Sequence, residues 1–202
     1  MANSRFRPFL YAAVGLVAVW AAVWAAYAYA HHTKMTAEKV RAYALGLNLD
    51  QLSADARAKS LKELADRINS LSPDERQKWR QGGEWKDLFN RMTEEERGNF
   101  IDATLPSGFK QALDAFSQMP PEKRKKMVDN ALVKMKEDAA AGIGPGTPNS
   151  NPNGPQLSPE LEQKVRGLGL KVLYSQSSPE TRADLAPLVE EIQRQVTHRN
   201  QP

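Results

Sequence analysis

Residues 71–75 read Leu-Ser-Pro-Asp-Glu, an order that places a hydroxyl side chain directly before a proline and two acids. A serine oxygen can accept hydrogen bonds from the unpaired amides of a first helical turn. Proline suits the first helical position, and carboxylates favour the positive end of the helix dipole. The stretch therefore predicts a helix that begins directly after Ser72.

The same arrangement recurs along the chain at 92–96, 157–160 and 177–180, with weaker copies at 52–56 and 119–122. Each copy predicts a helix start. The predicted capping positions are 53, 72, 93, 120, 158 and 178. Because the residues between these starts do not match one another, we expect a bundle of short helices rather than an array of structural repeats.

Apolar side chains recur at three- and four-residue steps after these starts. The clearest sets are Leu61, Leu64, Ile68 and Leu71; Trp85, Leu88, Phe89 and Met92; and Phe109, Ala112, Leu113 and Phe116. Such spacing forms one apolar stripe on each helix, which another helix must cover. Gly82-Gly83 and residues 105–108 (Leu-Pro-Ser-Gly) predict corners between helices. Since no segment alternates convincingly with a period of two, the sequence predicts an all-α fold with five or six helices between residues 35 and 139.

The composition changes abruptly at Ala140. Residues 140–156 combine Gly, Pro and Asn, which predicts a flexible linker. Residues 157–202 then carry two further apolar stripes and predict a C-terminal helical hairpin. The stripes are Leu161, Val165, Leu168 and Val172, and Leu185, Leu188, Val189, Ile192 and Val196. Two helices of this size bury too little surface to be stable alone, so we expect them to pack on the bundle, on a partner protein or on a second copy.

The chain begins with a short polar tail, residues 1–7, followed by an uncharged segment at 8–30, PFLYAAVGLVAVWAAVWAAYAYA. As a helix this segment would be about 34 Å long, enough to cross the roughly 30 Å core of a bilayer. It predicts a single transmembrane anchor, followed by a helical extramembrane domain at 31–139. A cleaved signal peptide is the alternative, because residues 26–30 contain small-x-small sites, but the apolar segment is longer than such peptides usually have.

The predicted anchor has two unlike faces. Ala18, Ala22 and Ala26 lie on one side of the helix, and Trp20 and Trp24 lie nearly opposite. Small residues at four-residue spacing allow another helix to approach closely, so these five residues are candidate contacts within the bilayer; plain lipid contact is the alternative. A short tail and a long distal domain favour a bacterial-type inner membrane, with the N-terminus cytoplasmic and the helical domain periplasmic.

The formal charge of +4 includes two arginines that precede the apolar segment, so the rest of the chain is close to neutral. This balance argues against binding to nucleic acid, which requires a clustered positive excess. The sharpest basic run is Lys123, Arg124, Lys125 and Lys126, on a helix that also has an apolar stripe. These four residues are candidate contacts to lipid headgroups or to an acidic partner, with a solvated surface as the alternative.

Residues with recognisable catalytic spacing are missing from the sequence. The absence of cysteine removes thiolate nucleophiles, disulfides and cysteine metal sites. His31, His32 and His198 do not have the spacing of metal ligands, and no phosphate-binding glycine loop is present. The consecutive acids at 94–96 fit a helix start better than an acid/base cluster. The sequence therefore predicts no cofactor, no metal and no enzymatic activity. An enzyme whose site is assembled from distant residues of the helical bundle is the remaining alternative.

These observations favour a non-enzymatic, single-pass membrane-anchored scaffold or accessory subunit, which acts through protein–protein contacts in a membrane assembly. The expected partners are the lipid bilayer and a membrane protein or complex, with a homo-oligomer also compatible with the sequence. A periplasmic helical chaperone or envelope-stress factor is the alternative. Residues 71–76, Leu-Ser-Pro-Asp-Glu-Arg, are similar to the repeated leucine-hydroxyl motif of Spy/CpxP-type chaperones but lack their glutamine, and no family function is carried over.

Overall fold

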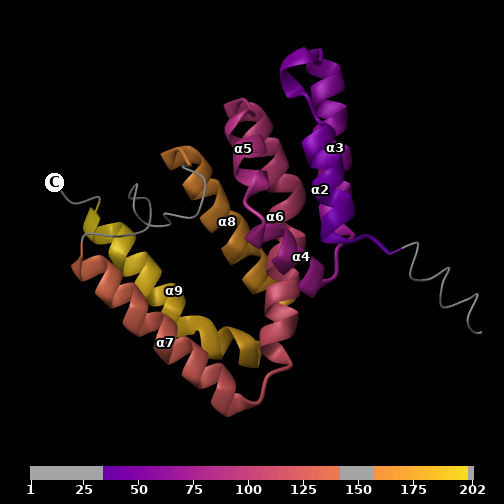
Figure 1. Ribbon diagram of the computed structural model, residues 1–202. Helices are drawn as coiled ribbons and strands as arrows, with labels where there is room; N and C mark the ends of the chain where they lie inside the picture. Colours follow the sequence, from indigo (N-terminus) through magenta and orange to yellow (C-terminus); the bar gives the residue numbers. More distant parts are fainter. Residues whose placement is uncertain (1–33, 142–156, 200–202) are drawn as a thin grey trace, which may run out of the picture.

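The computed structural model of the protein describes residues 34–141 and 157–199 (Figure 1). Over these two ranges the chain forms eight α-helices and one short 3-10 helix, without any strand. The elements are α2 (Ala37–Gly46), η2 (Leu49–Gln51), α3 (Ala54–Asn69), α4 (Pro73–Gln81), α5 (Glu84–Asn90), α6 (Glu94–Ser117), α7 (Pro121–Ala140), α8 (Pro159–Gln176) and α9 (Pro179–Arg199). The predicted all-α class is confirmed.

Each of the six predicted capping positions lies directly before a helix, which confirms the starts of α3, α4, α6, α7, α8 and α9. At every position except Pro120, the hydroxyl oxygen accepts a hydrogen bond from the amide three residues later. Thr93 and Glu96 form a reciprocal pair, because the Glu96 carboxylate also accepts from the Thr93 amide at 2.8 Å. Local hydrogen bonding therefore determines where these helices begin.

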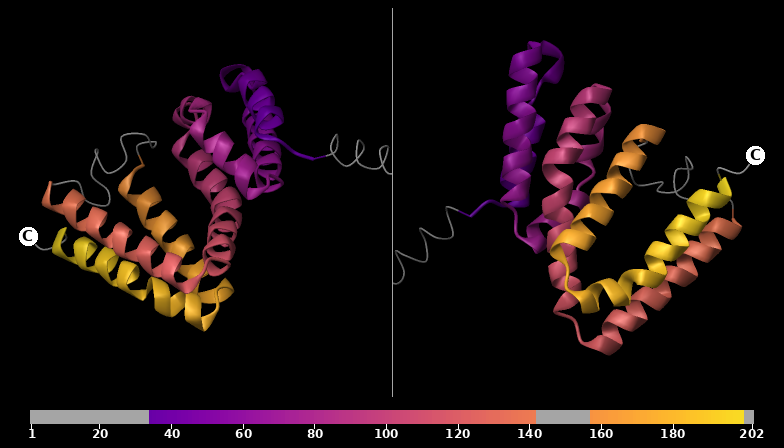
Figure 2. Two further views of the ribbon diagram at one scale, coloured as in Figure 1. Left: turned by 60° about the horizontal axis from the view of Figure 1, so that its bottom comes forward. Right: turned by 180° about the vertical axis from the view of Figure 1, so that it is seen from behind.

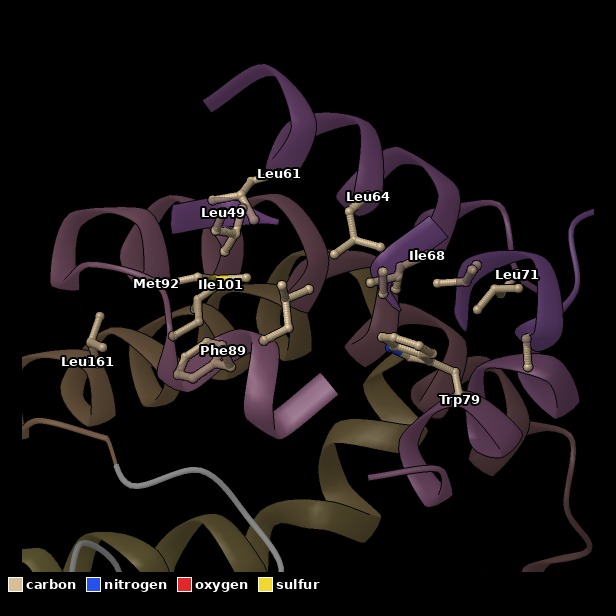
Figure 3. Close-up of a cluster of buried hydrophobic side chains, with 14 residues drawn as sticks. Leu49, Leu61, Leu64, Ile68, Leu71, Trp79, Phe89, Met92, Ile101 and Leu161 are labelled. Atoms are coloured by element: carbon tan, nitrogen blue, oxygen red, sulfur yellow. The ribbon is translucent and has the colours of Figure 1, made fainter. Parts of the chain in front are cut away.

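The main core lies where α2, α3, α4 and α5 pack around the N-terminal half of α6 (Figure 3). Its largest fully buried side chains are Val40, Leu49, Leu64 and Leu71. Most of the side chains in the first two predicted stripes are buried in this cluster, and Leu161 of α8 joins it from the other side of α6. Burial of each such side chain stabilises the fold by about 1.5–3 kcal/mol, so this cluster holds α2, α3, α4 and α5 together with α6.

The corner predicted at Gly82-Gly83 is confirmed, with Gly83 in a left-handed conformation at φ 81° between α4 and α5. The corner predicted at 105–108 is wrong, because α6 continues through Pro106.

A buried arginine of α4 contacts α6 at this proline. The Arg76 guanidinium donates to the Thr104 carbonyl at 3.3 Å and to Ser107 Oγ at 2.8 Å. Two further acceptors at the end of α3 lie at 3.0 and 3.2 Å, and burial lowers the pKa of Arg76. Gly108 provides the space, since a Cβ there would lie 2.9 Å from Arg76 Nη1. Packing on several helices and these side-chain hydrogen bonds stabilise a helix that proline would otherwise interrupt.

The two C-terminal helices do not pair with each other as the predicted hairpin would. They diverge from the connection at 177–178, and α8 packs along α6 while α9 packs along α7 (Figures 1 and 2). Lys164 of α8 forms an ion pair with Asp102 of α6 at 2.6 Å, and the Gln195 amide of α9 donates to the Met135 carbonyl of α7 at 3.2 Å. Both helices therefore pack within this chain, but on different helices.

The predicted anchor at 8–30 lies outside the described residues, together with its contact candidates Ala18, Trp20, Ala22, Trp24 and Ala26. Among the helices of residues 34–141 and 157–199, none combines the length and the apolar character needed to cross a bilayer. The predicted linker begins at the last residue of α7, and its residues 142–156 also lie outside the described ranges.

Candidate functional site: an apolar groove between α8 and α9

An open apolar groove lies between the diverging helices α8 and α9, with α6 as its floor. Its cavity volume is about 640 Å³, which falls within the usual range for ligand sites. Its α9 wall is the last stripe predicted from the sequence, namely Leu185, Leu188, Val189, Ile192 and Val196. These side chains are only half-buried, so the stripe is not covered as the first two predicted stripes are.

The opposite wall and the floor come from α8 and α6. Leu170 and Leu173 face the groove from α8, and Phe109 and Leu113 form its floor. Gly169 allows the Phe109 ring to lie against α8, because a Cβ at this position would be 3.1 Å from the ring. The floor is therefore closely packed, although the groove above it is open.

The α9 stripe remains uncovered because α9 contacts α7 through another face. At about 100° per residue, Glu180, Asp184 and Gln195 lie beside the apolar stripe rather than on it. These polar residues contact α7, where Arg124 pairs with both acids and the Met135 carbonyl accepts from Gln195. Helix α9 therefore packs through charged and amide groups and leaves its aliphatic face toward the groove.

Three polar side chains line the groove, and Arg166 is the charged one among the lining residues that the structure describes. Gln193 and Thr197 contribute from the last turns of α9. The Arg166 side chain is 33% exposed, and its Nη1 lies 3.7 Å from the Glu162 carboxylate. The two groups form an ion pair one helical turn apart, but that distance is longer than a hydrogen bond, so the guanidinium donors are not hydrogen-bonded to this acid.

The basic run on α7, residues 123–126, has three exposed side chains and one buried side chain. Lys123, Lys125 and Lys126 are exposed, as a contact to headgroups or to an acidic partner requires. Arg124 is buried instead, with an ion pair to Glu180 and one to Asp184 at 2.7 Å.

Arg124 also donates to the carbonyls of Ser117 and Met119 at 3.3 and 3.4 Å, where α6 ends. Its guanidinium therefore joins α6, α7 and the first turn of α9. The prediction that Arg124 contacts an external partner is corrected, because its donors are used within the chain.

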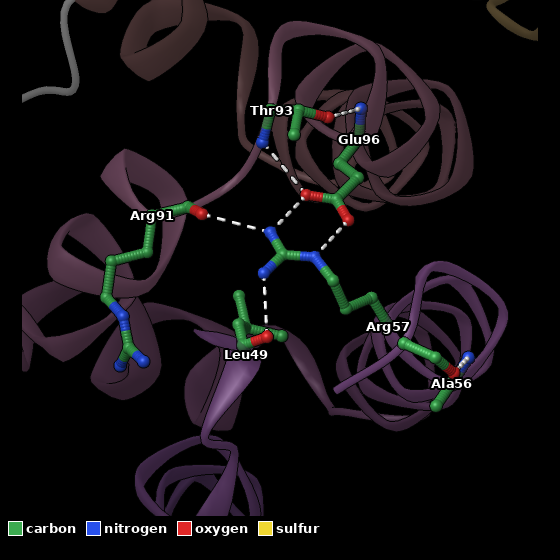
Figure 4. Close-up of polar contacts among 7 residues, drawn as sticks. Leu49, Ala56, Arg57, Arg91, Thr93 and Glu96 are labelled. Atoms are coloured by element: carbon green, nitrogen blue, oxygen red, sulfur yellow. Dashed lines mark hydrogen bonds and ion pairs between the residues drawn. The ribbon is translucent and has the colours of Figure 1, made fainter. Parts of the chain in front are cut away.

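The acids at 94–96 also have a structural role through Glu96 (Figure 4). Arg57 donates to both carboxylate oxygens of Glu96 at 2.7 Å and to the Leu49 carbonyl at 2.8 Å. The hydrogen bonds from Arg57 lower the pKa of Glu96. This network connects α3, η2 and the start of α6, and the sequence had not indicated Arg57 because its partners are far away along the chain.

Within residues 34–141 and 157–199, no three His, Cys, Asp or Glu side chains are grouped so that they could hold a metal ion. His31 and His32 lie outside these ranges. Sequence reasoning left open whether the α9 stripe packs on the bundle, on a partner protein or on a second copy. The structure leaves the stripe lining a groove, and the sequence signal for this site was the stripe itself.

Comparison of the chain with protein-family models, with curated proteins and with solved structures finds no match.

Proposed function

We propose that this chain is a non-enzymatic, single-pass membrane-anchored helical scaffold or accessory subunit, and that the groove between α8 and α9 receives an amphipathic helix of a partner protein. The observation that carries this proposal is the open α9 stripe from Leu185 to Val196. Contiguous exposed apolar surface is typical of interaction sites, and a helix laid in an apolar groove is a recurrent mode of recognition.

The chemistry of the lining favours binding over bond-making. General acid–base catalysis needs a titratable group of suitable pKa within reach of the substrate. Among the described lining residues, Arg166 is the charged side chain, and a guanidinium stays protonated in proteins. The groove thus offers apolar area and one guanidinium, which forms an ion pair with Glu162 outside the lining.

The membrane part of the proposal comes from the sequence. The segment at 8–30 would hold the groove close to a bilayer, with the N-terminus cytoplasmic and the helical domain periplasmic. The alanines and tryptophans of that segment would contact other helices within the membrane. Lys123, Lys125 and Lys126 on the exposed side of α7 would face headgroups or an acidic partner.

A periplasmic helical chaperone is the second candidate, because an open apolar groove could also hold exposed segments of unfolded proteins. The two candidates differ in selectivity. A chaperone should suppress the aggregation of an unrelated unfolded client at near-stoichiometric amounts, whereas a subunit of an assembly should retain one defined partner and leave such a client unprotected.

Site-specific photocrosslinking in native membranes tests the proposal. A photoreactive amino acid at Ile192 would lie in the groove, and the same amino acid at Val133, 55% exposed on α7, is the matched control. We expect a defined protein adduct from position 192 that position 133 does not give. Equal adducts from both positions, or adducts to lipid alone from position 192, would contradict a protein-binding groove.

A further inference from the structure

We infer that the helix received by the groove is about three turns long and carries a carboxylate that pairs with Arg166. This inference rests on the proposed function, because it specifies the chemistry of the partner for that same groove. It commits to a helix with an acidic side chain rather than to a basic or uniformly apolar segment.

The length of the partner helix follows from the lengths of the two groove walls, α8 and α9. The α9 stripe runs from Leu185 to Val196, which corresponds to about 17 Å along a helix axis. The α8 wall runs from Val165 to Leu173, or about 12 Å. An added helix of about three turns would match these two lengths and would present apolar side chains at i, i+3 or i+4, and i+7.

The shape of the walls favours a helix as the occupant. Both walls are helices whose groove-facing side chains are three or four residues apart, so each wall presents a row of ridges. Ridges of this spacing interlock with the side chains of another helix at interaxial distances of about 8–10 Å. Helices α8 and α9 diverge from their connection (Figure 2), and apolar side chains of both helices line the groove between them.

The acidic side chain of the partner helix is inferred from Arg166 and the residues around it. Arg166 lies on the half of α8 that is farther from the α8–α9 connection, and the last turns of α9 across the groove contribute the neutral side chains Gln193 and Thr197. Arg166 forms an ion pair with Glu162 of the same helix at 3.7 Å, a distance that leaves its donors without a hydrogen bond to this acid. A guanidinium binds carboxylates through two parallel hydrogen bonds, which an ammonium or an amide of the partner could not replace.

The groove-lining residues near the connection are aliphatic. Leu173 of α8 and Leu185 of α9 line this end. A partner helix with its acid at this end would bury an unpaired carboxylate against apolar side chains, which is costly. The acid should therefore lie at the Arg166 end, and this asymmetry selects one direction for the bound helix.

Peptide binding to the full chain tests the inference. The chain is placed in nanodiscs of a zwitterionic lipid, so that detergent does not compete for the groove. The probes are three fluorescent 15-residue helical peptides with one leucine stripe, identical except for Glu, Gln or Lys beside the stripe at one end. Fluorescence anisotropy gives the dissociation constants for the natural chain, for Arg166→Glu, for Arg166→Gln and for Lys171→Glu. Lys171 is exposed on α8 outside the groove lining and is the matched control.

We expect the Glu peptide to bind the natural chain about fivefold more tightly than the Lys peptide, as for a well-placed but partly exposed ion pair. Arg166→Glu should reverse this order, Arg166→Gln should abolish the preference, and Lys171→Glu should leave it unchanged. Higher salt should reduce the preference, because exposed charges are screened.

Other outcomes separate the inference from the proposed function. If all three peptides bind equally and Ile192→Asp abolishes their binding, the groove binds helices but the acidic partner is refuted. If no peptide binds while the single-chain carboxylate laurate does, the occupant is an amphiphile, and both the helical partner and the proposed function fail. If neither peptides nor laurate bind, both fail as well.

Discussion

Two glycines of α8 make a matched pair for testing the packing of the groove floor. A Cβ at Gly167 would meet no atom within 4 Å, whereas a Cβ at Gly169 would lie 3.1 and 3.3 Å from atoms of the Phe109 ring. Both residues have helical neighbours in the middle of α8. Alanine at each position therefore makes the same local change in backbone preference, and only one of the two substitutions disturbs a tertiary contact.

The change in the free energy of unfolding can be estimated separately for each substitution. Replacing a helical glycine by alanine stabilises a helix by about 0.8–1 kcal/mol, so Gly167→Ala should raise the free energy of unfolding by roughly that amount. Gly169→Ala gains the same term but must displace the Phe109 ring by a few tenths of an ångström, and overpacking of this kind costs about 1–3 kcal/mol. We expect Gly169→Ala to be neutral to destabilising by about 2 kcal/mol.

Thermal and urea unfolding of the full chain, followed by circular dichroism, would measure the difference. A change of about 1 kcal/mol shifts the melting temperature by about 2–4 °C in a chain of this size. In the double variant with Phe109→Leu, the cost of Gly169→Ala should fall, because the ring is removed. Equal stabilisation by the two alanines would refute the close approach of Phe109 to α8.

Three further predictions concern the core and the ion pairs. Leu64→Ala should lower the free energy of unfolding by about 2–5 kcal/mol, whereas Leu45→Ala, at a side chain that is 69% exposed, should change it by no more than about 0.5 kcal/mol in urea unfolding. The pKa of Glu96 is lowered by its arginine partner, so its carboxylate stabilises the fold above the unfolded-state pKa of about 4.3, and this stabilisation is lost as the pH falls through the lowered value. Glu96→Gln should therefore remove part of the pH dependence of unfolding below about pH 4.3, and an unchanged acid titration would contradict the Glu96 contact. Arg124→Gln should speed amide hydrogen exchange in α7 and α9, while Lys125→Gln should not; equal effects would contradict the buried position of Arg124.

Arg124 shows what the neighbouring sequence cannot predict about a charged residue. In the sequence it belongs to a run of four cations, and nothing nearby distinguishes it from the lysines beside it. Its acidic partners, Glu180 and Asp184, are more than fifty residues away along the chain. A sequence pattern can show that a charge exists, but the fold decides whether another part of the chain neutralises it.

The sequence alone determined where six of the eight described helices begin and which class of fold they form. The reason is that a cap such as Ser72 or Thr93 bonds to amides three residues away, so its effect is complete within one helical turn. Only the tertiary structure decided that α6 continues through Pro106, that Arg124 is buried and that α8 and α9 separate to form a groove. Each of these depends on side chains from distant helices, and the energies of such contacts are not encoded in the spacing of neighbouring residues.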